Sequence, residues 1–170
     1  TISTYCEKLP QFLLYALVIQ VGLNLGANAE LGKMVKDIRF SSLLLPFFTI
    51  IGTLVFSAAA SLLLTSWNIY DCMAVGSGFA YYSLSSLLIV QLKEASAGIE
   101  IASQLGAIAL LANIIREMLA LFGAPLYASF FGKFAPVSVA GINSMDVCLP
   151  VISRYSGKSI VPVAIIHGII

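Results

Sequence analysis

Charge is the property that this sequence has least of. Charged side chains make up 10% of its 170 residues, whereas an ordinary soluble domain carries roughly 25%. Hydrophobic residues make up 59%, and the mean hydropathy is +0.99. A water-soluble surface cannot be built from so few charges, and a formal net charge of +1 leaves no basic surface for nucleic acid. We therefore expect an integral membrane protein that has the lipid bilayer as its solvent.

The sequence also lacks the common patterns of enzymes and metal sites. Its three cysteines, Cys6, Cys72 and Cys148, form no CxxC pair or Cys/His cluster, so we expect no metal site and interpret them as small core hydrophobes. No GxSxG, HExxH or Walker-type motif is present, which argues against the standard hydrolases and NTPases. The prediction is a protein that is not an enzyme and has no cofactor, with H⁺ or Na⁺ as the candidate coupling ion.

Apolar segments of helical length follow one another along the chain. They run over Leu9–Leu25, Leu43–Thr65, Cys72–Leu92, Ile101–Phe122, Ala135–Ile152 and Ile160 to the end. Most approach the roughly 20 residues that a helix needs to cross a bilayer. We expect one all-α membrane domain over residues 1–170 with about six transmembrane segments. Because no signal peptide precedes the first segment and the last is short, we also expect N-terminal helices and the end of the last helix to be missing.

The positions of the basic residues predict how the segments are oriented. Most of them follow the first, third and fifth segments, namely Lys33, Lys36, Arg39, Lys93, Arg154 and Lys158, while Lys8 and Lys133 lie on the other side. The positive-inside rule places the larger set in the cytoplasm and Trp67 and Tyr70 in an outer loop. The third and fifth segments would then both run from outside to inside, in parallel.

Two segments carry helix-breaking residues. The third contains Gly76 and Gly78, and the fifth is bracketed by Pro136 and Pro150 with Gly141 inside. Interrupted helices are tolerated at membrane depth only where protein or water satisfies the freed backbone groups. In transporters such breaks mark the binding site near the bilayer midplane. The alternative is two kinked or re-entrant helices that serve only for packing.

The fourth segment has one small and polar face. Gly106, Ala109, Asn113, Arg116, Glu117 and Ala120 recur at helical spacing, opposite Ile108, Leu111, Ile115 and Leu119. An acid within a membrane should face the protein interior or a cavity, so we expect Glu117 to bind a substrate or cation. The alternative is a structural ion pair, although Arg116 and Glu117 diverge by about 100° on a helix and should not pair with each other.

A second intramembrane acid, Asp146, follows Asn143 and Ser144 in the broken fifth segment. A carboxylate beside unwound backbone suits Na⁺, H⁺ or an ammonium group, and the alternative is a helix cap at the break. Tyr82, Ser83, Asn113, Asn143 and Ser144 are the expected neutral hydrogen-bonding residues. His167 is either a proton carrier or a hydrogen-bonded packing residue. Asp71, Glu94 and Glu100 are expected in loops as solvated charges.

Four motifs resemble the lysine exporter family LysO. They are GSGFAYYSLS at 76–85, NIIRE at 113–117, GINSMDVCLP at 141–150 and His167-Gly168; the resemblance spans nearly the whole chain and is strongest in its second half, as for the C-terminal portion of a LysO protein. It implies a bacterial inner-membrane exporter of L-lysine and analogues such as thialysine, with a fold related to the cation/proton antiporter and bile-acid transporter group. The intramembrane acids of the family correspond to Glu117 and Asp146, with a further acid in an N-terminal portion. An N-terminal membrane subunit or a homodimer is the implied partner.

Two other functions stay open at this point. The first is a related transporter of another small solute, for which Arg116 would favour an anion. The second is a non-catalytic membrane subunit whose polar helix face docks a partner helix. The sequence by itself therefore favours transport of a small cation such as lysine in exchange for H⁺ or Na⁺.

Overall fold

A computed structural model describes residues 40–170 continuously, together with the isolated positions 12, 16, 19, 20 and 23. Those five positions are helical, and the rest of the predicted Leu9–Leu25 segment lies outside the described residues. Residues 39–170 form one compact unit. Its regular structure over 40–170 is entirely helical: α3 (Phe40–Ala60), α4 (Ile69–Gly76), α5 (Tyr82–Ala97), α6 (Ile99–Phe131), α7 (Ala135–Ala140), the 3₁₀ helix η1 (Gly141–Met145), α8 (Leu149–Ser156), the 3₁₀ helix η2 (Lys158–Ile160) and α9 (Val161–Ile169). The prediction of an all-α fold is confirmed.

Two helices are long and apolar enough to cross a membrane. One lies within α3, over Leu43–Ala60, and the other is the 33-residue α6. At 1.5 Å per residue α6 is about 50 Å long, more than the hydrocarbon core of a bilayer. These two helices support a membrane location.

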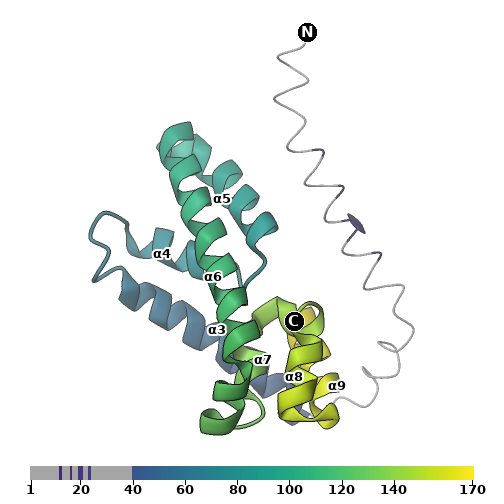
Figure 1. Cartoon of the computed structure of the whole chain (residues 1–170). Helices are drawn as coiled ribbons and strands as arrows, with labels where there is room; N and C mark the ends of the chain where they lie inside the picture. Colours follow the sequence, from purple (N-terminus) through teal and green to yellow (C-terminus); the bar gives the residue numbers. More distant parts are fainter. Residues whose placement is uncertain (1–11, 13–15, 17–18, 21–22, 24–39) are drawn as a thin grey trace. The chain divides into compact units, whose positions relative to one another are not determined.

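The long helix α6 packs against α4, α5, α7 and α8 (Figure 1). Apart from Leu105, its buried residues are small or polar, including Gly106, Ala109, Asn113 and Ala120. The opposite face is exposed at Ile108, Leu111, Ile115 and Leu119. The predicted stripe is confirmed. Gly98 and Gly132, with φ of 81° and 86°, reverse the chain at the two ends of α6. Thus α5 ends beside the start of α6, whereas α7 begins beside its end.

The third apolar segment is a helical hairpin. It breaks over residues 77–81, where Phe79 and Ala80 have φ of 44° and 72°. At the open end Asp71, near the start of α4, forms an ion pair with Lys93, near the end of α5, at 2.6 Å. The chain therefore runs along α4 to the break and returns along α5, so that the end of α5 lies near the start of α4. We call α4 and α5 the first hairpin, and residues 77–81 its tip.

The fifth segment breaks in the same manner. Between α7 and α8 the chain passes through η1, and Gly141, with φ of 61°, marks the change of direction. The two helices lie side by side (Figure 1), and Val137 of α7 and Ile152 of α8 belong to one buried cluster with Ala120 of α6. We call α7 and α8 the second hairpin, and residues 141–148 its tip.

These hairpins correct the orientation predicted from the basic residues. Trp67 was placed outside and Lys93 in the cytoplasm, but the Asp71–Lys93 ion pair holds residues 67–71 and Lys93 at one end of α6. The prediction that the two broken segments run in parallel is also wrong. The first hairpin opens at the start of α6 and the second at its end, so their tips approach each other from opposite directions.

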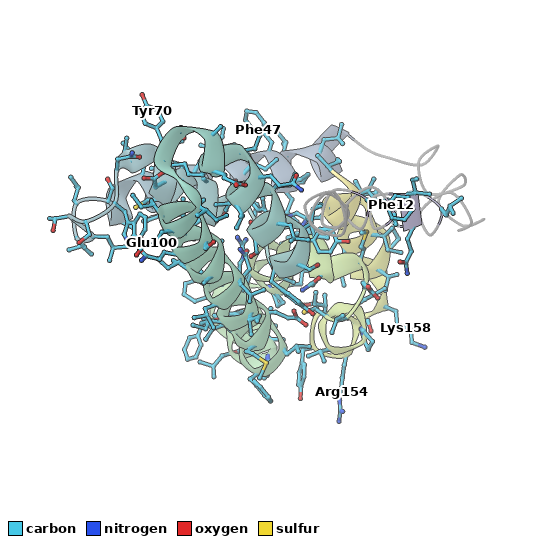
Figure 2. The ribbon with its side chains drawn as sticks, turned by 90° about the horizontal axis from the view of Figure 1, so that it is seen from above. Phe12, Phe47, Tyr70, Glu100, Arg154 and Lys158 are labelled. Atoms are coloured by element: carbon cyan, nitrogen blue, oxygen red, sulfur yellow. The ribbon has the colours of Figure 1, made fainter. Side chains whose placement is uncertain are left out.

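A second correction concerns three acids that were expected in loops. Asp71 lies in the first turn of α4 and is buried, Glu94 lies in α5, and Glu100 lies in the first turn of α6. A hydropathy segment ends at the first charge, whereas helical hydrogen bonding continues past it. Figure 2 shows that Arg154 and Lys158 project away from the helices, as expected of solvated charges.

Candidate functional site at the crossing of two hairpin tips

The tips of the two hairpins meet beside the middle of α6. The backbone N of Ile142 donates to the carbonyl of Phe79 at 3.0 Å, and Asn143 Nδ2 donates to the carbonyl of Ala80 at 3.3 Å. Only glycine fits at position 141, because a Cβ there would overlap the Phe79 carbonyl. The crossing is therefore built from backbone contact between two interrupted helices.

Asn113 joins α6 to the first hairpin. Its Oδ1 accepts from the backbone N of Ala80 at 2.8 Å, and its Nδ2 donates to the carbonyls of Ala109 at 2.8 Å and Val75 at 3.5 Å. The side chain is 3% exposed. Backbone groups freed by the break are thus satisfied by one amide, as a break inside a membrane requires.

Arg116 joins α6 to the second hairpin. Its Nε donates to the carbonyl of Val139 at 2.9 Å and its Nη2 to that of Ser138 at 3.1 Å. These carbonyls belong to the last turn of α7, the negative end of a helix dipole. The guanidinium also lies 5.3 Å from the ring centroid of Phe79 in the first tip. Arg116 therefore contacts the first tip and the last turn of α7. Among the described residues no carboxylate forms an ion pair with it.

A chain of hydroxyl groups and a histidine connects α3 to the second tip. Ser144 Oγ donates to the carbonyl of Ala164 at 2.8 Å and lies 3.4 Å from His167 Nδ1. His167 Nε2 lies 3.1 Å from Thr49 Oγ1, which is 3.0 Å from Ser138 Oγ. Ser144 and His167 are both buried. His167 is thus buried and has a hydroxyl group next to each ring nitrogen. A hydrogen-bonded packing residue was one of its two predicted roles.

The two predicted acids belong to two of the elements that form the crossing. Glu117 follows Arg116 on α6 and is half-buried, and Asp146 lies in the second tip, just after η1, and is exposed. No cation of the described chain forms an ion pair with either of them. Within the described residues both carboxylates are therefore free of a cationic partner.

Some predicted residues lie away from the crossing, and others at it were missed. Tyr82 is 38% exposed, and no hydrogen bond to its side chain or to that of Ser83 is formed within the described residues. The preceding residue, Tyr81, instead lies in the first tip, where its backbone N donates to the carbonyl of Gly78 at 2.7 Å. Thr49 and Ser138 were overlooked because single hydroxyl residues in apolar segments give no distinctive pattern. Their role depends on contacts between distant segments.

Two cavities adjoin the crossing. The larger, about 250 Å³, reaches from Trp67 and Asp71 to Asn113 and Arg116; we call it the inner cavity. The smaller, about 80 Å³, is lined by Thr49, Phe79, Gly141 and His167, among others. Cys72 and Cys148 are free and buried, as expected of core residues, and Cys6 lies outside the described part. Within that part no cluster of His, Cys, Asp and Glu is arranged to hold a metal ion.

Comparison with known proteins identifies the family of this chain. The family model described as lysine exporter LysO matches residues 1–170. The chain is 27% identical over 159 residues to a Haemophilus influenzae protein that carries the name of a lysine exporter, and 26% identical over 168 residues to lysine exporter LysO of Escherichia coli K12. The matches cover 94% and 98% of this chain, and 76% and 52% of the relatives. No solved structure matches. The chain belongs to the lysine exporter LysO family.

Proposed function

We propose that this chain is part of a secondary transporter that exports L-lysine and cationic analogues such as thialysine from the bacterial cytoplasm. The observation that carries the proposal is the position of two carboxylates at a crossing of two interrupted helices, Glu117 next to Arg116 on α6 and Asp146 in the second tip. Both lack a cationic partner within the described part of the chain. A carboxylate so placed matches the ammonium group of lysine and equally a coupling cation.

The energetics of export require coupling. Moving a lysine cation outward against an inside-negative potential costs about 2.3 kcal/mol per 100 mV. Inward movement of H⁺ or Na⁺ can supply that free energy if one site binds either the coupling cation or the substrate ammonium but not both. We assign this exclusive binding to Glu117 and Asp146. Asn113, Arg116, Asn143 and Ser144 hold the crossing around them, and His167 belongs to the adjoining hydroxyl chain.

We further propose a multi-pass arrangement in the inner membrane in which the two hairpins re-enter from opposite faces. Lys133 lies just beyond α6, and α8 brings Arg154 back along α7 toward the same end. The positive-inside rule then places this end in the cytoplasm and the Asp71–Lys93 end outside. Opposed interrupted helices that cross are the feature that supports a relationship to the antiporter-type fold.

Efflux of labelled L-lysine from preloaded cells that lack their own exporter tests the function. We expect Glu117→Gln and Asp146→Asn each to abolish lysine efflux, because neither amide carries the negative charge that balances the bound cation. Glu100→Gln is the matched control, since Glu100 is an exposed acid on the same helix. Unchanged efflux in both variants would overturn the assignment of the two acids.

The same assay tests the partner. The chain spans about half the length of its Escherichia coli relative, and we propose that an N-terminal membrane subunit or a second copy of this chain completes the transporter. Efflux should then require the partner and should appear when the two are co-expressed. A chain that inserts and binds no lysine, yet co-purifies with a second membrane protein, would instead be a non-catalytic subunit.

A further inference from the structure

A buried ion pair stands at the open end of the first hairpin. Asp71 is 7% exposed, and its Oδ1 lies 2.6 Å from Lys93 Nζ. The backbone at Asp71 is fixed, because its N donates to Asn68 Oδ1 at 2.9 Å in the first turn of α4. A buried carboxylate needs a cation beside it. Asp71 is thus a rigidly held anion whose cation comes from a long, flexible side chain.

Two cavities meet at this ion pair. The inner cavity extends from Asp71 toward Asn113 and Arg116 at the crossing. A second cavity of about 430 Å³, which we call the vestibule, is lined by Thr65, Ser66, Trp67, Asn68, Asp71, Lys93, Ala97 and Ile101. Its volume falls within the roughly 300–1,000 Å³ of small-molecule sites. Trp67 and Asp71 line both cavities.

We propose that the Asp71 carboxylate is a binding subsite for a ligand's primary ammonium group, and that Lys93 occupies this subsite when no ligand is present. The ligand class is a diamine or an amino acid with a terminal ammonium group. Trp67 lines the vestibule together with this carboxylate, and an indole ring is the aromatic group that attracts a cation most strongly. The proposed function is needed only to name lysine as the natural ligand.

Exchange of one ammonium for another makes this subsite selective. When a ligand ammonium replaces Lys93, the buried Asp71 carboxylate keeps a cationic partner throughout. A neutral or anionic molecule brings no cation, so displacing Lys93 would leave a buried, unpaired charge. The displaced Lys93 side chain, which is 28% exposed, can then meet a ligand carboxylate from the vestibule. The exchange therefore favours a ligand that carries an ammonium group.

Fluorescence can test the subsite directly, because Trp67 is the single tryptophan of the chain and lines both cavities. The whole chain in lipid nanodiscs is titrated with L-lysine, with cadaverine, which lacks the carboxylate, and with hexanoate, which lacks both ammonium groups. Trp67 emission should respond to lysine and cadaverine with saturation, and not to hexanoate. Hexanoate binding as tightly as lysine would overturn the proposal.

Variants of Asp71 and of Lys93 should change the affinity for cadaverine in opposite directions. Asp71→Asn should weaken cadaverine binding about thirtyfold or more, as expected for loss of one partner of a buried charge pair. Lys93→Met should strengthen cadaverine binding by roughly tenfold, because the internal competitor is removed. A purely structural ion pair would weaken binding in both variants, and that result would refute the subsite. Glu100→Gln is the control and should leave binding unchanged, since Glu100 lines neither cavity.

A double variant covers the case in which Asp71→Asn fails to fold. Asp71→Asn with Lys93→Met removes both charges, so no unpaired ion is buried. It should fold, which its thermal unfolding checks, and should give no Trp67 response to cadaverine. A response equal to that of the wild type would contradict the proposal.

The subsite and the proposed export can fail separately. Glu117→Gln should abolish efflux and keep the Trp67 response, because Glu117 does not line the vestibule. A wild-type response without efflux in any form would refute export and leave the subsite standing. Efflux with equal amine binding in wild type, Asp71→Asn and Lys93→Met would refute the subsite and leave export standing.

Discussion

At the scale of single residues, Arg116 has a structural task that the sequence did not indicate. It was considered as an anion-binding group or as a partner for an acid, but its Nε and Nη2 are both used by the carbonyls of Val139 and Ser138. These carbonyls are orphaned because α7 ends at the second tip. A guanidinium suits this position, since its rigid planar fork reaches two adjacent acceptors at once.

Arg116→Lys should therefore destabilise the protein although it keeps the charge. An ammonium on a flexible stem cannot hold both carbonyls in this geometry, and losing one charge-assisted hydrogen bond costs about 1.5–3 kcal/mol. Arg116→Met should destabilise the protein more than Arg116→Lys, because both carbonyls are left without a donor. Thermal unfolding of the purified proteins measures the order of stability of the wild type and the two variants. Arg154→Lys, at an exposed site in α8, is the control and should change stability by less than about 0.5 kcal/mol; equal stability of the two lysine variants would contradict this role.

At the scale of elements, the crossing depends on a close backbone approach. Gly141 has a φ of 61°, and a Cβ at this position would overlap the Phe79 carbonyl. The Gly141→Ala variant should therefore have a strained backbone at residue 141, and its methyl group should push the two tips apart. We expect the free energy of unfolding to fall by more than about 2 kcal/mol, because backbone strain alone costs roughly 1–3 kcal/mol and the contact between the tips is lost as well. Chemical or thermal unfolding provides the measurement.

Gly157→Ala separates the two causes of that loss. Gly157 has a φ of 86° and no atom near the position of an added Cβ, so its variant reports backbone strain alone. The difference between the two variants then measures the contact between the tips. If Gly141→Ala and Gly157→Ala were equally destabilised, the close approach at the crossing would contribute nothing.

The sequence predicted the breaks themselves but not how the broken segments are arranged. Gly76 and Gly78 lie at the break of the third segment and Gly141 at that of the fifth, while Pro136 and Pro150 stand in the first turns of α7 and α8. These are local features, and local features can be seen in a sequence. Whether a broken helix continues or turns back depends on contacts such as the ion pair of Asp71 and Lys93. Those residues lie 22 positions apart, and hydropathy carries no information about their pairing. The polar face of α6 was predictable because helical periodicity is local too.

At the scale of the whole molecule, two hairpins enter from opposite ends of one long helix and touch at its middle. Arg116 and Asn113, one turn apart on α6, contact the second and first hairpins respectively. A shift of either hairpin along α6 therefore alters the contact between the tips, which lie beside Glu117 and Asp146. Such an arrangement can link the exposure of the two carboxylates to the position of the hairpins, which is what alternating access requires.

This arrangement predicts which positions share a face of the membrane. In a background without cysteine, Ser66→Cys and Ser96→Cys are placed at the two arms of the first hairpin, where both native residues are exposed, and Lys133→Cys is placed beyond the far end of α6. A membrane-impermeant maleimide added to intact cells should label the first two positions alike and reach Lys133→Cys only after permeabilisation. A third segment that crossed the membrane would instead leave Ser66→Cys labelled and Ser96→Cys protected. Equal labelling of all three positions would contradict the placement of the two ends of α6 on opposite faces.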